Sequence, residues 1–112
     1  MDYKTIANDG IVEEEIKKSR FICHLKRISN EEEGREYIAQ IKKEHHKANH
    51  SCSAMIVGED GQIKRSSDDG EPSGTAGVPM LTVLEKQGLT NVVAVVTRYF
   101  GGIKLGTGGL IR

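Results

Sequence analysis

Residues 98–112 combine glycines with basic and hydroxyl side chains, and they contain no acid. They hold five of the thirteen glycines of the chain. Glycine lets a backbone approach a ligand closely, and backbone N–H groups at a helix N-terminus attract anions. We therefore predict a surface that binds an anion, an RNA backbone or a protein partner. Its members in this segment are Arg98, Tyr99, Gly101, Gly102, Lys104, Gly106, Thr107, Gly108 and Arg112.

A second glycine-rich stretch, SSDDGEPSGTAGVP at residues 66–79, carries three carboxylates and has no apolar periodicity. We expect it to form the rim of the same surface. Close carboxylates could hold Mg²⁺ or act as an acid and base pair. The alternative is a solvated turn with its corner at Asp69 and Gly70, in which one aspartate caps a neighbouring backbone. The rim residues are Asp68, Asp69, Gly70, Glu71, Ser73 and Gly74.

A purely structural role is an open alternative for both segments. The glycines would then serve only tight turns and close packing of helices on the sheet, and Arg98 would pair with Asp68 or Asp69. The segment GIKLGTGG does not match the phosphate loop in which Lys directly precedes Ser or Thr, so it is not specific for nucleotides.

The sequence gives little support for a catalytic site or a metal-binding site. The residues with side chains that zinc prefers are His45, His46, His50 and Cys52, and their spacing fits no usual zinc pattern. Ser73 and Thr107 are loop hydroxyls without an assigned base. We predict no catalytic residue, no metal site and no cofactor.

The net charge of zero results from 16 basic and 16 acidic residues that are unevenly distributed. Residues 59–85 carry six acids against two bases, whereas residues 86–112 carry four bases and no acid. Such asymmetry is typical of an anion-binding face beside an acidic loop, with chance over short windows as the alternative. Aromatic residues make up only 4%, so RNA binding would rest on charge and backbone, and sequence-specific DNA binding is not expected.

Cys23 and Cys52 match neither a disulfide framework nor a CxxC motif. The longest apolar run is far short of the ~20 residues that a membrane span needs, and the N-terminus has no apolar signal region. We therefore expect reduced thiols in a cytoplasmic protein that has no membrane partner.

Alternation of apolar and polar residues predicts a hairpin of two strands around residues 12–16 and 21–25. Ser29 and Glu32 have capping-box spacing, and one apolar face predicts a helix over residues 30–47. Two further strands are predicted at residues 52–57 and 63–66.

The second half of the chain continues with a helix from about Gly77 to Gly88, because Pro79 is tolerated in a first turn and glycine often ends a helix. A largely apolar strand follows at residues 92–96, covered on at least one face. Another helix is expected to begin near Leu105 or Gly108, and the chain ends inside it. We therefore expect a domain truncated at its C-terminal end.

Two long motifs, SDDGEPSGTAG at residues 67–77 and VVTRYFGGIKLGTGGLIR at residues 95–112, resemble the N-terminal domain of the IMPACT/YigZ family. The segments KKSRFICHL at 17–25 and HHKANHSCS at 45–53 support the resemblance, which covers essentially the whole chain. It implies a fold like the second domain of ribosomal protein S5. Bacterial members typically carry a second, ferredoxin-like C-terminal domain, and we expect this chain to end before it.

The resemblance also implies a role in translation. Eukaryotic members regulate translation by binding a ribosome-associated activator of a stress kinase, and bacterial members resemble elongation-factor domains, which suggests contact with nucleic acid or the ribosome. The family offers no catalytic residue to carry over. An S5-like fold also occurs in small-molecule kinases, but fold alone transfers no chemistry.

These observations predict an α+β fold: a two-layer sandwich with a four- to five-stranded sheet and two helices on one face. Residues 1–112 form one domain. The expected function is a non-enzymatic regulatory binding module in translation, which binds the ribosome and its RNA or a translation-regulatory protein. The alternative is a nucleotide- or phosphoester-binding enzyme that uses the glycine-rich loop and Mg²⁺. The oligomeric state is left open.

Overall fold

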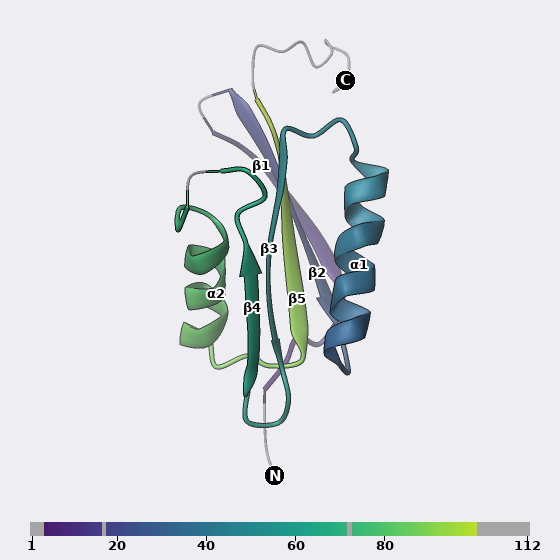
Figure 1. Cartoon of the computed structure of the whole chain (residues 1–112), viewed down its shortest axis with the longest axis vertical. Coiled ribbons are helices and arrows are strands. Elements are labelled where there is room, and N and C mark those ends of the chain that lie inside the picture. Colours follow the sequence, from purple (N-terminus) through teal and green to yellow (C-terminus); the bar gives the residue numbers. More distant parts are fainter. Residues whose placement is uncertain (1–3, 17, 72, 101–112) are drawn as a thin grey trace.

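The computed structural model describes residues 4–16, 18–71 and 73–100. Within them, five strands form one antiparallel sheet with the order β1-β2-β5-β3-β4, and two helices pack on it (Figure 1). The predicted α+β class is confirmed. The elements are β1 (Gly10–Ile16), β2 (Ser19–Arg27), α1 (Glu31–Glu44), β3 (His50–Val57), β4 (Ile63–Ser67), α2 (Gly77–Lys86) and β5 (Val92–Tyr99).

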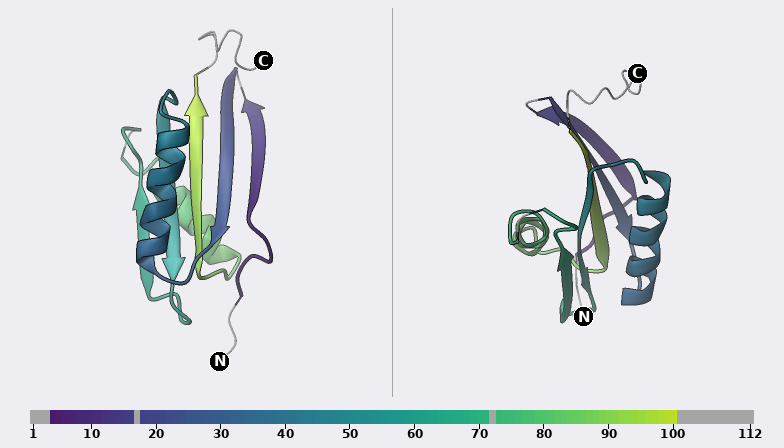
Figure 2. Two further views of the ribbon diagram at one scale, coloured as in Figure 1. Left: turned by 90° about the vertical axis from the view of Figure 1, so that its right-hand side faces the viewer. Right: turned by 45° about the horizontal axis from the view of Figure 1, so that its top comes forward.

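The sheet lies between the two helices, as both views of Figure 2 show. Side chains alternate along β3, so Met55 and Val57 pack in the cluster under α1, while Ala54 and Ile56 pack under α2. The prediction that both helices cover one face of a two-layer sandwich is therefore wrong. The physical reason for the two-sided arrangement is that consecutive residues of β3 and β5 are apolar. Apolar side chains therefore lie on both faces of the sheet, and each face needs a helix to cover it.

Helix α1 begins at a reciprocal cap. The Asn30 side chain accepts from the backbone N–H of Glu33 at 2.8 Å, and the Glu33 carboxylate accepts from the N–H of Ser29 at 2.7 Å. A variant of the predicted capping box thus lies one residue further along the chain: Asn30 is the cap in place of Ser29, and Glu33 binds the N–H of the residue before the cap. The helix ends at Glu44, three residues before the predicted end.

Helix α2 begins at Gly77, as predicted, with Pro79 in its first turn. Gly88, which follows its C-terminus, has a φ of 70°, in the left-handed region that glycine favours. Leu84 is the buried anchor of this helix on the sheet. Among the described residues, no helix combines the length and apolar character that crossing a membrane requires. The helix predicted near Leu105 or Gly108 lies outside the described residues.

Candidate functional site

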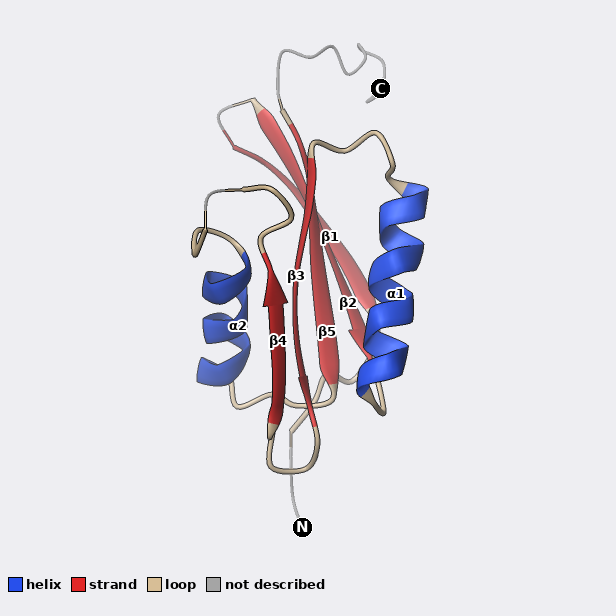
Figure 3. Cartoon of the chain, in the orientation of Figure 1, coloured by secondary structure: helices blue, strands red, loops and turns tan. Residues whose placement is uncertain are grey.

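The end of β5 and the loop that joins β4 to α2 meet at one end of the sheet (Figure 3). Arg98 makes the connection: its Nη1 donates to both carboxylate oxygens of Glu71, at 3.1 and 3.0 Å. The two predicted halves of the surface therefore touch each other. The partner of Arg98 is Glu71 rather than the expected Asp68 or Asp69, because those two carboxylates bind backbone groups of the loop and of β3.

Two aromatic rings hold the Arg98 guanidinium in place. Its Cζ lies 5.3 Å from the ring centroid of Phe21 and 4.7 Å from that of Phe100, within the range of cation–π attraction. Phe21 reaches this position because the β2–β5 register places it opposite Arg98. With only 31% of its side chain exposed and Glu71 only 12% exposed, the pair is partly shielded from water.

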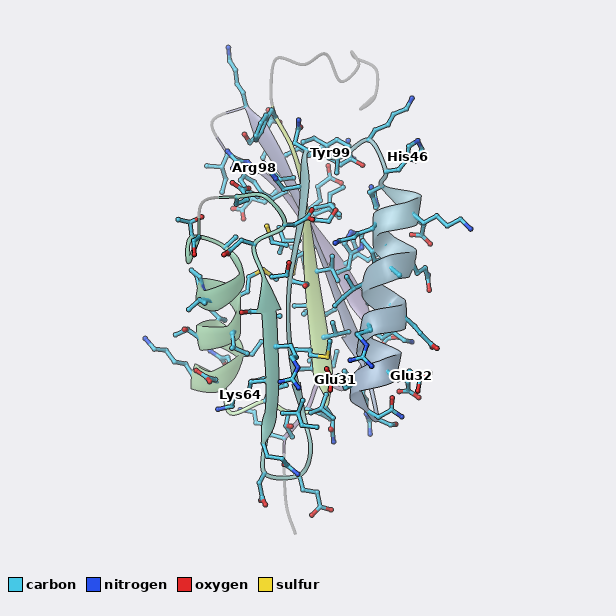
Figure 4. All side chains as sticks on the ribbon, viewed as in Figure 1. Glu31, Glu32, His46, Lys64, Arg98 and Tyr99 are labelled. Carbon is cyan, nitrogen blue, oxygen red and sulfur yellow. The ribbon has the colours of Figure 1, made fainter. Side chains whose placement is uncertain are left out.

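Tyr99 occupies the opposite face of the same strand end, where Figure 4 shows it close to Arg98 at the top of the sheet. Its hydroxyl forms a 2.5 Å hydrogen bond with Nδ1 of His45, the residue that follows α1. The Arg20 guanidinium lies 5.7 Å from the Tyr99 ring centroid. The group at this end, which we call the aromatic–arginine cluster, consists of Arg20, Phe21, Arg98, Tyr99 and Phe100. It holds three of the five aromatic residues of the chain.

Asp68 organises the loop before α2. Its Oδ1 accepts from the backbone N–H of Gly77 at 2.7 Å and of Ala76 at 3.1 Å, and its Oδ2 accepts from that of Gly74 at 2.9 Å. The bonds from Gly77, Gly74 and Ala76 lower the pKa of Asp68 below its ordinary value, although some desolvation opposes them. The alternative prediction, that an aspartate of this loop caps a neighbouring backbone, is confirmed.

The corner predicted at Asp69 and Gly70 is also present, since both have positive φ, at 46° and 90°. The Glu71 N–H closes the turn by donating to the Asp68 carbonyl at 3.0 Å. Asp69 then ties the loop to its neighbours: its Oδ2 accepts from the N–H of Ser51 at 2.6 Å, and its Oδ1 lies 3.3 Å from Nζ of Lys42.

Three of the four zinc-type side chains of the sequence, those of His45, His50 and Cys52, have local partners. Nδ1 of His50 lies 2.9 Å from the Asp69 carbonyl, and Cys52 donates to the Asp68 carbonyl at 3.2 Å. Burial, followed by the nearby carboxylates, raises the pKa of Cys52 to about 11, so its thiol is protonated at neutral pH and is a poor nucleophile. In the described part of the chain, no three His, Cys, Asp or Glu side chains are grouped to hold a metal ion.

A groove of about 520 Å³ adjoins the cluster between α2, the loop and the sheet. The Arg98 and Glu71 pair forms part of its lining, and most of the remaining lining is apolar. The groove can therefore take an apolar side chain whose polar end lies near the ion pair. The lining residues are Phe21, Cys52, Glu71, Thr75, Ala76, Pro79, Met80, Val96 and Arg98.

The structure thus brings the predicted site residue Arg98 together with Glu71, in the loop that Asp68 and Asp69 hold in place, whereas Tyr99 lies on the opposite face of the same strand end. Gly70 forms the corner of the loop and Gly74 donates to Asp68, while Ser73 is exposed. The predicted members Gly101, Gly102, Lys104, Gly106, Thr107, Gly108 and Arg112 lie outside the described residues.

Sequence reasoning missed Arg20, Phe21 and His45 as members of this site. The available signal was strand register: once β2 and β5 pair, the segment around Phe21 must lie beside Arg98. His45 was considered only among the side chains that zinc prefers, but it lies just beyond the end of α1 and its Nδ1 meets the hydroxyl of Tyr99.

Comparison with known proteins gives consistent matches. The model of the Impact N-terminal domain matches residues 17–112. The IMPACT family member YvyE of Bacillus subtilis is 61% identical over 110 residues, which cover 98% of this chain and 51% of YvyE. The chain therefore spans about half the length of this relative.

Solved structures agree with these matches. A crystal structure of a hypothetical protein, 47% identical, superposes with a TM-score of 0.83 and covers 96% of this chain and 53% of the other. The two-domain translational regulator Yih1, 25% identical, superposes with a TM-score of 0.64 over 95% of this chain and 43% of its own.

Proposed function

Because the chain belongs to the Impact N-terminal domain family, we propose that it is a non-enzymatic binding module in translation that acts on a translation-associated protein. Yih1 is described as a translational regulator, and this supports a role of the chain in translation. The aromatic–arginine cluster favours a protein as the partner, and it is the observation on which this proposal rests.

Arginine and tyrosine are enriched among the residues that contribute most to protein–protein binding, and a residue already held in place loses less conformational entropy on binding. Arg98 is held in this way by Glu71 and by two rings. Because Glu71 also balances its charge, Arg98 adds no net positive charge to the described surface. This combination suits a protein partner better than a polyanion.

RNA is the second candidate, and the four bases without an acid in residues 86–112 favour it. On that alternative, the basic side chains outside the described residues make most of the contact with RNA, and Arg98 contributes to it. The enzymatic alternative has weaker support, because each of the three loop carboxylates already accepts hydrogen bonds from backbone groups or from Arg98.

Replacing Glu71 by Gln separates the two candidates. The substitution removes the negative charge that fixes Arg98, so a protein partner that uses the fixed guanidinium should bind about two- to tenfold more weakly. RNA should instead bind more tightly and with a steeper dependence on salt, because an unpaired cation is released. Glu85→Gln is the matched control, since Glu85 pairs with Lys64 at 3.0 Å on the edge strand β4, outside the cluster.

The measurement is capture of ribosomal fractions on the immobilised chain, with and without nuclease, followed by mass spectrometry. Retention of one translation-associated protein after nuclease, and its weakening by Glu71→Gln alone, supports the proposal. Loss of all partners after nuclease, together with stronger capture by Glu71→Gln, would establish RNA as the partner. Equal behaviour of both variants would rule out the cluster as the contact.

A further inference from the structure

Strand β1 (Gly10–Ile16) forms an open edge of the sheet. Among the described strands it pairs only with β2, and all seven of its residues are exposed. Figure 2 shows it at the margin of the sheet, away from both helices. In an antiparallel pair, alternate residues direct their N–H and C=O groups away from the partner strand. The outer side of β1 is therefore a row of backbone donors and acceptors to which another strand can add.

Proteins commonly protect such an edge with proline, charged side chains, a bulge or a covering element. Among the described residues, β1 shows only the charged side chains: the strand contains no proline, its register with β2 is unbroken over seven pairs, and no described element covers it. It also exposes large apolar side chains, with 67% of Ile11, 63% of Val12 and 48% of Ile16 accessible. Apolar side chains exposed beside free backbone groups favour contact with another chain.

The charges of β1 restrict which chain can add. Glu13, Glu14 and Glu15 are consecutive, so their side chains alternate between the two faces of the sheet. Glu13 pairs with Arg20, whereas Glu14 and Glu15 take part in none of the ion pairs found among the described residues. A strand laid along β1 would therefore meet uncompensated negative charge on both faces.

The opposite edge of the sheet differs. β4 has five residues, and its basic side chains are engaged: Lys64 pairs with Glu85 of α2 and Arg65 with Glu31 of α1. Both partners come from the helices that flank this edge. Of the two edges, only β1 combines length, exposed apolar side chains and unpaired charge.

We infer that β1 accepts an extended segment of a partner protein in which apolar and basic residues alternate, as a sixth strand of the sheet. Backbone hydrogen bonds give the affinity, and lysine or arginine opposite the glutamates gives the specificity. A second copy of this chain is a poor occupant, since two β1 strands would place glutamates against glutamates. The inference does not depend on the aromatic–arginine cluster or on a role in translation.

The test is titration of the isotope-labelled chain with a short, capped peptide of alternating lysine and valine, followed by NMR. We expect shifts centred on residues 10–16 and slower amide exchange in the same strand. The double variant Glu14→Lys with Glu15→Lys should bind about tenfold more weakly. The control variant Glu59→Lys with Asp60→Lys makes the same change of charge in the β3–β4 turn and should leave the affinity unchanged.

A peptide of alternating glutamate and valine completes the test: it should bind the Glu14→Lys, Glu15→Lys variant and not the wild-type chain. This gain of binding also shows that the variant is folded. The inference is overturned if both peptides bind the wild-type chain equally, if a peptide with N-methylated backbone amides binds as well as the unmodified one, or if the β1 signals shift with protein concentration alone.

Discussion

At the scale of single residues, His24 is a buried titratable group whose charged form is disfavoured in the folded chain. It is 2% exposed, its Nδ1 has no hydrogen-bond partner among the described residues, and its Nε2 lies 3.5 Å from the hydroxyl of Thr97. The ring of His45 lies 5.2 Å away between centroids. Burial, and then the charge of His45, lower the pKa of His24 below its ordinary value of 6.5, while Glu44 opposes the shift.

His24 should therefore make folding stability depend on pH. Since its pKa is lower in the folded chain, the unfolded chain binds more protons near pH 6 and stability falls as the pH drops below 6.5. Urea unfolding between pH 5 and pH 8 measures this effect. His24→Leu should flatten the profile, whereas His46→Gln, at an exposed position, should not. An unchanged profile in His24→Leu would assign the dependence to other groups.

At the scale of elements, Gly77 sets the distance between α2 and the sheet. A Cβ atom at this position would lie 2.7 Å from the backbone nitrogen of Ser67 and 2.8 Å from its carbonyl oxygen. Those atoms belong to the last residue of β4 and cannot move as a flexible side chain does. The first residue of α2 therefore has to be glycine for this packing.

Gly77→Ala should destabilise the chain by about 1–3 kcal/mol, the usual cost of inserting an atom into close packing. Gly10→Ala is the control, because no atom of the described residues lies within 4 Å of a Cβ built there. Chemical denaturation of both variants measures the difference. Equal stability of the two would show that α2 can shift away from β4 without loss.

The sequence was sufficient to locate each element to within a few residues, because periodicity, Pro79 and Gly88 are local signals. It did not place the helices, since the side of the sheet that a helix covers depends on how connections cross it. The continuous apolar run of β5 did contain a clue: residues such as Val92 and Val93 are consecutive and both 0% exposed, which requires cover on both faces.

The site was predicted only in part, for a similar reason. Glycine, acid and arginine content identified the two segments, and they do meet. The choice of Glu71 over Asp68 or Asp69 depends on the αL corner of the loop, which directs the aspartates towards the backbone. Phe21 lies far away in sequence and joins Arg98 only through strand register.

At the scale of the whole molecule, stability is concentrated in the middle of the sheet. β5 lies between β2 and β3, and Val92, Val93, Val95 and Thr97 are fully buried. β1 has the opposite character, with every residue exposed. The two strands therefore represent the extremes of local protection in the described chain.

Hydrogen exchange should show this gradient. The amides of β5 should open only with global unfolding, whereas those of β1 should exchange roughly a thousandfold faster or more, given a domain of ordinary stability. Mass spectrometry of peptides from residues 10–16 and 92–99 compares them within one sample. Similar exchange rates in both strands would contradict the assignment of β1 as a weakly held edge.

The central position of β5 has a further consequence for how the chain is made. The sheet contains two hairpins, β1 with β2 and β3 with β4, which do not pair with each other. Each hairpin pairs instead with β5, the last of the five described strands in sequence. During synthesis, both hairpins leave the ribosome with an unpaired inner edge, and the sheet closes only when residues 92–99 have emerged. Until then the nascent chain presents two aggregation-prone edges, and its need for a chaperone should be greatest in that interval.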